Sequence, residues 1–204
     1  ILEVAKEIFK NEKMNLAFIP TAANVEPGDR KWLIDDLNRC RKLNFKQIDI
    51  VDIAVTSIER LNSADILFFG GGNLYYLMSQ MKKSGLQKLL PEMLKTKIYV
   101  GLSAGSMVVS KWWSGKIDHF LYNEDPNDSD RYSCLGYYEF HIIPHLNLPD
   151  FPKCNLQNIS RIAREIKEPI YALDDNSAIQ VLDDRIEVVS EGKWKISLSV
   201  FPCW

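Results

Sequence analysis

Short apolar runs alternate with amphipathic stretches along the first half of the chain. The runs with the composition of buried strands are residues 15–19, 45–53, 66–69 and 97–100. The stretches with apolar residues at helical spacing are residues 1–11, 33–40, 74–83, 86–94 and 104–109. Strands that alternate with helices are typical of an α/β fold. We therefore predict a mostly parallel sheet with helices on both faces.

The pattern loosens in the second half of the chain. Residues 112–136 contain the polar segment 123–130, which predicts a solvated and acidic surface loop. The elements predicted after it are strands at 138–143 and 170–173, a helix at 155–166, an antiparallel hairpin of 177–182 with 185–189, and a third antiparallel strand at 194–198. No repeat, low-complexity tract or linker interrupts the chain, so we predict a single domain over residues 1–204.

Composition and charge exclude several classes of protein. Apolar residues make up 46% of the chain and charged residues 25%, as in a soluble globular protein. The formal net charge is −2, which gives no basic footprint for a nucleic-acid partner. No apolar run approaches the roughly 20 residues of a membrane span. We therefore expect neither a nucleic-acid nor a membrane partner, and the oligomeric state is left open.

Four cysteines are scattered through the sequence, and they form no C-x-x-C pair: Cys40, Cys134, Cys154 and Cys203. A chain with this apolar content needs no disulfide framework, so we predict reduced thiols in a cytoplasmic protein. The first nine residues are amphipathic, unlike a secretory signal. Because the chain begins at Ile1 rather than Met, we expect that it starts inside a longer product.

The strongest candidate for chemistry is Gly101-Leu102-Ser103-Ala104-Gly105, which lies between a predicted strand and a predicted helix. In such a G-x-S-x-G motif, small flanking residues allow a sharp turn from which the serine hydroxyl projects. Ala104 would begin the helix, so its backbone N–H points at an oxyanion that forms beside Ser103. The motif therefore predicts a nucleophilic serine with an adjacent oxyanion donor.

A second glycine-rich turn, Gly70-Gly71-Gly72-Asn73, follows the preceding predicted strand. Three glycines leave backbone N–H groups exposed to bind an anion. Tyr75 stands where a dinucleotide motif needs another glycine, and the Gly-Lys-Ser/Thr of a P-loop is absent. Open α/β sheets place their sites at such strand ends, so we predict a second oxyanion donor here, with substrate contacts from Gly71 and Asn73.

The chain has only three histidines from which to choose a general base. His119 falls in the polar stretch, and His141 lies inside a predicted strand, where a packed side chain is more usual. His145 follows Pro144 at the end of that strand, where a site residue belongs. Pro144 also prevents the helix that would make His141 and His145 zinc ligands. We predict His145 as the base, and we expect no metal and no cofactor.

Asp174 and Asp175 come directly after the predicted strand 170–173. A carboxylate there can hold the imidazole in the required tautomer, as in a Ser-His-Asp triad. The other aspartate would belong to an ordinary Asp-Asp-Asn turn. In the chain order of an α/β-hydrolase, the acid would instead be one of Asp118, Asp125, Asp128 or Asp130.

Four segments together resemble the peptidase E family of serine peptidases, which includes the aspartyl dipeptidases: Phe69-Gly-Gly-Gly-Asn73, Gly101-Leu-Ser-Ala-Gly105, Pro144-His145 and Leu173-Asp-Asp-Asn-Ser-Ala178. The similarity covers nearly the whole chain. It implies a glutamine-amidotransferase-like (flavodoxin-like) α/β fold in which serine replaces a nucleophilic cysteine. It also implies a first strand ahead of residue 1.

The resemblance also implies roles for individual residues. Ser103 matches the nucleophile, His145 the base, and Asp175 rather than Asp174 the acidic member of the triad. The backbone N–H groups of Gly72 and Ala104 match the oxyanion donors. Asp118 matches an acidic position that could bind a substrate amine, and the alternative is a solvated loop carboxylate.

These residues predict a serine hydrolase that cleaves short peptides through an acyl-enzyme. The alternatives are an esterase or amidase that acts on a non-peptide acyl compound, and a non-catalytic binding domain of the same fold. The resemblance implies an arginine early in the helix after the catalytic histidine, where an aspartyl dipeptidase binds the substrate carboxylate. Asn158 stands at that position, and Arg161 follows about one turn later, so we expect a weak preference for N-terminal aspartate.

Overall fold

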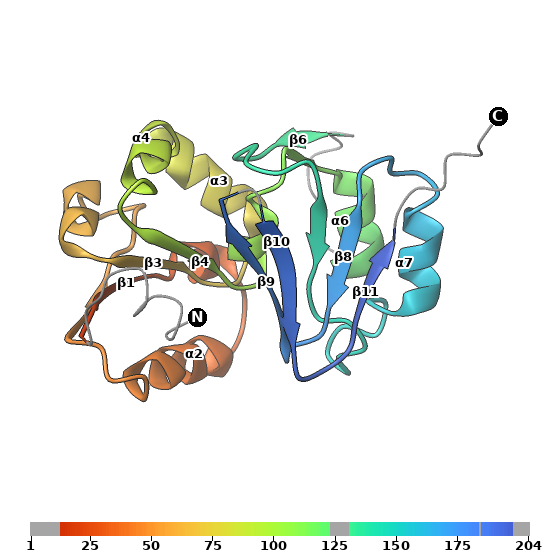
Figure 1. Ribbon diagram of the computed structural model, residues 1–204, viewed down its shortest axis with the longest axis horizontal. Coiled ribbons are helices and arrows are strands. Elements are labelled where there is room, and N and C mark those ends of the chain that lie inside the picture. The colour runs from red at the N-terminus through yellow and green to blue at the C-terminus, as the bar shows by residue number, and fades with distance from the viewer. Residues whose placement is uncertain (1–12, 123–130, 184, 198–204) are drawn as a thin grey trace. The chain divides into compact units, whose positions relative to one another are not determined.

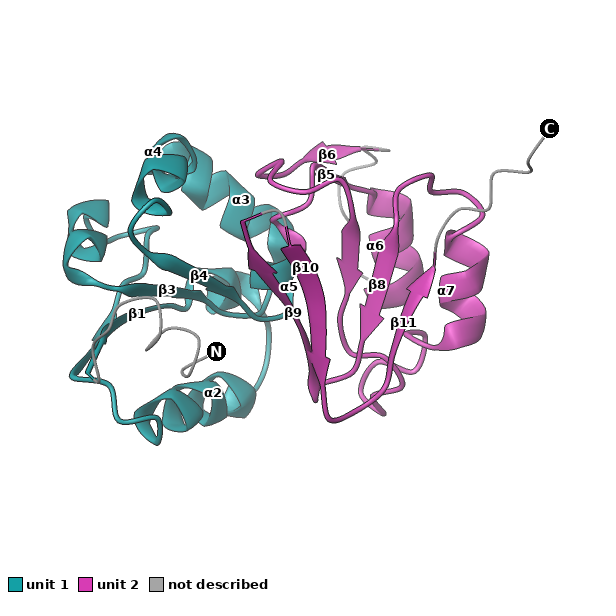
Figure 2. Ribbon diagram, in the orientation of Figure 1, with its two compact units in different colours: residues 1–106 teal, residues 107–204 magenta. Residues whose placement is uncertain are grey.

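The computed structural model describes residues 13–122, 131–183 and 185–197 (Figure 1). The chain divides into two compact units, residues 1–106 and residues 107–204 (Figure 2). The helix predicted over residues 1–11 and the polar segment 123–130 lie outside the described residues. The single domain over residues 1–204 stays a prediction.

The first unit is built on a four-stranded parallel sheet in the order β2-β1-β3-β4. Its elements are β1 (Asn15–Ile19), the 3-10 helix η1 (Thr21–Val25), α2 (Lys31–Arg41), β2 (Gln47–Ile50), the 3-10 helix η2 (Ile58–Ser63), β3 (Ile66–Phe69), α3 (Leu74–Lys83), α4 (Leu86–Met93), β4 (Ile98–Gly101) and the start of α5 (Ala104–Met107). The two central strands, β1 and β3, are almost entirely buried, which explains why they appear in the sequence as continuous apolar runs.

Helices cover both faces of this sheet, with α2 on one face and α3 and α4 on the other (Figure 1). Leu33 and Leu37 of α2 pack against a buried cluster that includes Leu16, Phe18 and Cys40. The residues that recur at helical spacing in the sequence therefore form the face of α2 that packs against the core. The predicted α/β fold with a parallel sheet between helices is confirmed.

The second unit contains a three-stranded sheet in the order β11-β8-β7 and two antiparallel strand pairs. Its elements are β5 (Trp112–Trp113), α6 (Gly115–Tyr122), β6 (Tyr132–Ser133), β7 (His141–Ile143), α7 (Leu156–Ile162), β8 (Ile170–Leu173), β9 (Ser177–Leu182), β10 (Arg185–Ser190) and β11 (Trp194–Ser197). Strands β7 and β8 are parallel, whereas β9 pairs with β10 and β5 with β6 in antiparallel fashion. The predicted hairpin is therefore confirmed.

The predicted third antiparallel strand is found as β11, which pairs antiparallel with β8 and not with a strand of the hairpin. Asp174 accepts a hydrogen bond from the Lys193 N–H and thereby turns the chain back along β8. The stretch after residue 112 also contains α6, whose apolar residues Ile117 and Leu121 are buried one turn apart, so His119 lies on a helix and not in a loop.

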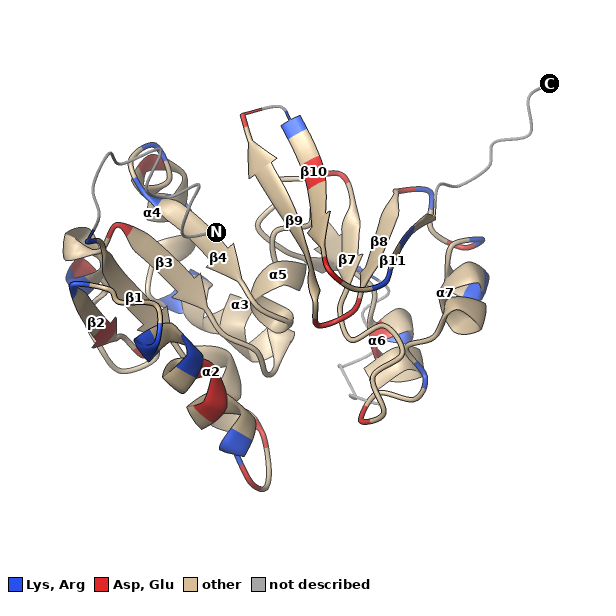
Figure 3. Ribbon diagram, turned by 60° about the horizontal axis from the view of Figure 1, so that its bottom comes forward, with Lys and Arg blue, Asp and Glu red and all other residues tan. Residues whose placement is uncertain are grey.

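Acidic and basic side chains are interspersed in the first unit (Figure 3). On α2, Lys31 pairs with Asp35 at 3.1 Å and Arg39 pairs with Asp36 at 3.0 Å. Both pairs are local, at the i,i+4 and i,i+3 spacings that stabilise an exposed helix. On α2, basic and acidic side chains therefore neutralise one another in local pairs.

The three cysteines that the structure describes, Cys40, Cys134 and Cys154, are buried free thiols. Burial raises the pKa of the Cys40 and Cys154 thiols to about 11, so neither is a thiolate nucleophile at neutral pH. Cys203 lies outside the described residues. None of the helices in the described part of the chain is long and apolar enough to cross a membrane.

Candidate active site

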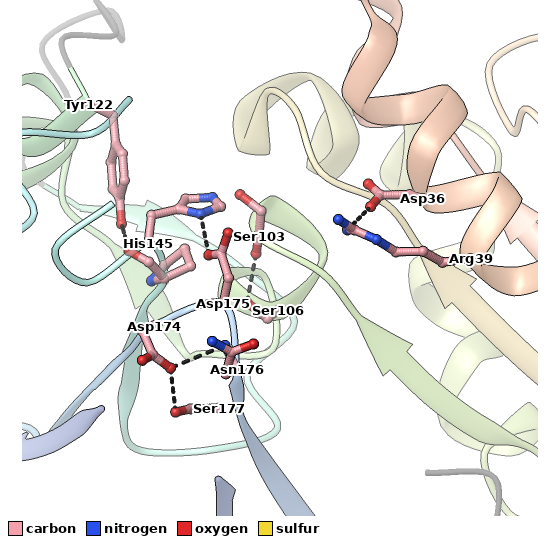
Figure 4. A network of polar contacts seen from close by, with 11 residues as sticks. Asp36, Arg39, Ser103, Ser106, Tyr122, His145, Asp174, Asp175, Asn176 and Ser177 are labelled. Carbon is pink, nitrogen blue, oxygen red and sulfur yellow. Dashed lines mark hydrogen bonds and ion pairs between the residues drawn. The ribbon is translucent and has the colours of Figure 1, made fainter. Parts of the chain in front are cut away.

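Ser103 occupies a strained turn between β4 and α5. Its φ is +48°, in the left-handed region that residues other than glycine rarely adopt. The turn is held by two hydrogen bonds that converge on the Ser103 carbonyl, one from the Ser106 N–H at 2.8 Å and one from Ser106 Oγ at 2.7 Å (Figure 4). This is the backbone expected of a serine that projects its hydroxyl from the end of a strand.

The two glycines of the motif are required by close packing around this turn. A Cβ on Gly101 would collide with the carbonyl of Gly105, and a Cβ on Gly105 would collide with the carbonyl of Phe69. The Leu102 N–H also donates to the Phe69 carbonyl at 2.9 Å, which ties the turn to β3. The spacing of G-x-S-x-G therefore reflects a helix that begins directly against its own strand and the neighbouring one.

The glycine run after β3 lies beside Ser103. A Cβ on Gly71 would be 3.2 Å from Ser103 Cβ and 3.7 Å from Ser103 Oγ. Gly72 has a φ of +121°, and a side chain there would collide with the carbonyl of Ala22 in η1. Among the described residues, the N–H groups of Gly72 and Ala104 donate to no other backbone group, so both can serve an anion. The Asn73 side chain instead caps α3, where its Oδ1 accepts from the Tyr76 N–H at 2.9 Å.

A carboxylate supports η1, the element on which Gly72 rests. Asp52 accepts hydrogen bonds from Thr21 Oγ1 and from Asn24 Nδ2, each at 2.8 Å, and from the Ala54 N–H at 3.0 Å. Burial alone would raise the pKa of Asp52, but these hydrogen bonds outweigh it and lower the pKa. Asp52 is therefore ionised at neutral pH and holds η1 in place through its hydrogen bonds to Thr21 and Asn24.

In the second unit, His145 and Asp175 form a pair. His145 Nδ1 lies 3.0 Å from Asp175 Oδ1 (Figure 4). An ionised carboxylate only accepts hydrogen bonds, so this contact selects the tautomer that carries its proton on Nδ1. The His145 backbone is left-handed, with a φ of +65°, and the ring is stacked on Phe151 with centroids 4.2 Å apart. Pairing and stacking together set the orientation of the imidazole; no sequence signal identified Phe151.

The neighbouring Asp174 has a different role. Its carboxylate accepts from Ser177 Oγ at 2.6 Å and from the Asn176 N–H at 3.1 Å (Figure 4). It also accepts from the Lys193 N–H. These hydrogen bonds outweigh its slight burial and lower the pKa of Asp174. Asp174 therefore holds the turn after β8, and Asp175 is the aspartate that contacts the histidine.

Two further candidates from the sequence, Asp118 and His141, are buried in the second unit. Asp118 is 1% exposed in α6 and accepts a hydrogen bond from Trp113 Nε1 at 2.9 Å, so its alternative interpretation as a solvated loop carboxylate is wrong. His141 is 2% exposed and packs edge-on against Trp112 and Trp113, as expected of a packed strand residue. The alternative acids Asp125, Asp128 and Asp130 lie outside the described residues.

His141 gives the protein a predictable dependence on pH. Burial lowers the pKa of His141 below its ordinary value of 6.5, and neither ring nitrogen has a hydrogen-bond partner among the described residues. At a pH just below 6.5, His141 is therefore protonated in the unfolded chain and still neutral in the folded chain. The free energy of unfolding should therefore fall as the pH drops below about 6.5. The urea midpoint should fall less between pH 7.5 and pH 5.5 in His141→Phe than in the wild type. An equal fall in both proteins would contradict this, and His119→Gln, on the exposed side of α6, is the control.

Sequence comparison places these elements in a known family. The model of peptidase family S51 matches residues 1–189. Uncharacterized peptidases from Pasteurella multocida and Listeria innocua are 24% and 26% identical, and the alignments cover 83% and 84% of this chain and 82% of each relative. A peptidase E from Streptomyces coelicolor is 28% identical over 63% of this chain and 53% of its own length.

Solved structures share the fold. A protein from Listeria monocytogenes EGD-e that is assigned as a peptidase E has a TM-score of 0.74 at 23% identity, with 94% of both chains covered. A peptidase from an acI-B1 actinobacterium has a TM-score of 0.70 at 21% identity, with 98% of this chain and 85% of that chain covered. With the family match over residues 1–189, the chain belongs to peptidase family S51 and is a serine-type peptidase.

Proposed function

We propose that the protein hydrolyses short peptides through an acyl-enzyme, with a triad of Ser103, His145 and Asp175. Ser103 Oγ attacks the scissile carbonyl while His145 takes its proton, and the N–H groups of Gly72 and Ala104 hold the resulting oxyanion. His145 then protonates the leaving amine. In the second half of the reaction His145 takes a proton from water, which attacks the ester, and returns that proton to Ser103 Oγ as the carboxylic acid leaves. Asp175 orients the imidazole and stabilises its charged form.

The left-handed backbone of Ser103 is the observation that carries this proposal. A non-glycine residue at a φ of +48° is strained, and such strain persists where the surroundings impose it. Here the surroundings are two glycines packed against backbone carbonyls and a third, Gly71, packed against the serine itself. A turn without chemistry has no need of a serine at this point, because glycine would adopt the same backbone without strain.

Covalent labelling tests the proposal. A fluorophosphonate should modify Ser103 in the wild type and should leave Ser103→Ala unlabelled, as read by mass spectrometry of the peptide that contains residue 103. The matched control is Ser63→Ala, since Ser63 is a serine of the first unit that lies outside the motif and whose Oγ donates to the Arg60 carbonyl at 3.2 Å. Labelling elsewhere in the wild type, or none at all, would contradict the proposed nucleophile.

We further propose that preference for an N-terminal aspartate is weak. Selection of that substrate needs a cation for its carboxylate. Asn158 replaces the arginine implied by the resemblance, and its Nδ2 donates to the Lys153 carbonyl at 2.9 Å. Arg161 holds its guanidinium over the Phe120 ring, 5.5 Å from the centroid, where it packs on α6.

The ratio of kcat/KM for Asp-Ala to that for Ala-Ala measures this preference. One missing charge-assisted pair corresponds to roughly 10- to 150-fold, so we expect the ratio to stay far below that of a strict aspartyl dipeptidase. A preference for Asp-Ala above about a thousandfold would show that another cation has taken over the recognition.

We also expect the protein to act in the cytoplasm. The three described cysteines are free, and buried reduced thiols are usual where glutathione and thioredoxin keep them reduced. Fractionation of the source cells followed by immunoblotting would test this expectation.

A further inference from the structure

Trp32 lies beside the proposed nucleophile and has no part in the mechanism above. The point where a Cβ on Gly71 would stand is 3.7 Å from Ser103 Oγ and 3.8 Å from Trp32 Cζ3. The serine hydroxyl and the indole therefore both lie next to the buried Gly71 backbone, which carries no side chain to separate them. Trp32 reaches this position from the first turn of α2.

The indole of Trp32 is not needed for the packing of the first unit. Leu33 and Leu37 of the same helix pack against the core, whereas the Trp32 residue is 37% exposed. Among the described residues, no aromatic ring stacks on Trp32 and its Nε1 donates to no acceptor. By contrast, Trp112 Nε1 donates to Glu168 at 3.1 Å and Trp113 Nε1 donates to Asp118 at 2.9 Å. A large exposed ring without such a partner, placed at a reactive group, is typical of a binding surface.

The charges next to Trp32 favour an apolar group against the indole over a carboxylate. The Arg30 guanidinium donates to the carbonyls of Asn24 and Glu26, at 3.2 Å and 2.9 Å. Lys31 pairs with Asp35 at 3.1 Å. Both cations that directly precede Trp32 in the sequence are therefore engaged, and the surface that remains is the indole.

We propose that Trp32 determines substrate specificity by packing against an apolar side chain of the residue whose carbonyl Ser103 attacks. This inference rests on the proposed function, because it assigns the substrate class of that same site. A leucine-sized side chain that packs against the indole removes apolar surface of both groups from water. A methyl group covers less of the indole and gains less.

The test compares Leu-Ala with Ala-Ala as substrates. The wild type should prefer Leu-Ala by about tenfold or more in kcat/KM, because a few additional methylene groups in an apolar pocket give discrimination of this size. Trp32→Ala should reduce the preference to less than about threefold, and Trp32→Phe should keep most of it. Ile34→Ala is the matched control, since Ile34 is an apolar residue of the same helix, is 60% exposed, and should leave the ratio unchanged.

The rate of Ser103 phosphonylation by a small fluorophosphonate separates the two proposals. This rate should be the same in the wild type and in Trp32→Ala, because the probe has no side chain for the indole to contact. If the wild type is labelled at Ser103 but the Leu-Ala preference survives in Trp32→Ala, the role of Trp32 is wrong and the proposed function stands. If Ser103 of the wild type is not labelled, the proposed function fails, and the role of Trp32 fails with it.

Discussion

Ser103→Ala should lower kcat for dipeptide hydrolysis by about 10⁶-fold, which is the size of effect seen when the nucleophile of a serine peptidase is removed. The loss should appear in kcat with little change in KM, because the binding groups remain in place. The variant should also fold, since alanine is smaller than serine and the hydrogen bonds from Ser106 go to the backbone carbonyl of residue 103. Single-turnover kinetics with a chromogenic ester and with a dipeptide measure the loss.

The strained backbone makes a second variant informative at the same position. Glycine adopts a left-handed φ without strain, so Ser103→Gly should be as inactive as Ser103→Ala and should melt at the same temperature or higher. An active site that stores strain at its nucleophile predicts this combination. A loss of kcat below about tenfold in both variants would show that Ser103 is not the nucleophile.

Asp175→Asn should lower kcat by about 10⁴-fold, the second-largest effect that the proposed triad predicts. Its Oδ1 lies 3.0 Å from His145 Nδ1. An amide nitrogen at this position would donate a hydrogen bond and favour the tautomer with its proton on Nε2, which cannot accept the serine proton. The loss should shrink at high pH if hydroxide replaces the imidazole as the base.

Asp174→Asn is the matched control, because the same substitution is made one residue earlier. Asp174 accepts hydrogen bonds from Ser177, Asn176 and Lys193, so its replacement should lower the melting temperature by a few degrees. Its kcat should stay within about tenfold of the wild type. If Asp174→Asn shows the large loss of kcat and Asp175→Asn does not, the acidic member of the triad is Asp174 and the assignment of Asp175 is wrong.

Much of the fold could be predicted because its local signals are strong. Strand 170–173 was expected where β8 is found, since a central strand that is buried almost throughout is a continuous apolar run. Helix α6 was missed because its apolar positions, Ile117, Phe120 and Leu121, span little more than one turn and lead directly into the polar segment 123–130. The partner of β11 could not be predicted, because the strand pairs with β8, which lies before the hairpin in the chain, and no local signal marks that pairing.

The candidate site divides in the same way. Ser103 could be predicted because the glycines that permit its turn are its neighbours in the sequence. The residues alone left Asp174 and Asp175 as alternatives, because adjacent side chains of a turn point in different directions and only the folded chain shows which one meets His145. Trp32 and Phe151 gave no signal, since their partners, Gly71 and His145, come from other elements.

The crystal structure of the protein after reaction with a fluorophosphonate tests the triad most directly, because the adduct resembles the tetrahedral intermediate. We predict a phosphorus–oxygen bond at Ser103 Oγ, with the phosphonyl oxygen about 2.7–3.1 Å from the backbone nitrogens of Gly72 and Ala104. His145 Nε2 should lie about 2.6–3.2 Å from Ser103 Oγ or from the alkoxy oxygen that stays on phosphorus after fluoride leaves, with Nδ1 still paired to Asp175. An adduct at another residue, or an adduct at Ser103 with His145 turned away and a different base in its place, would contradict the account.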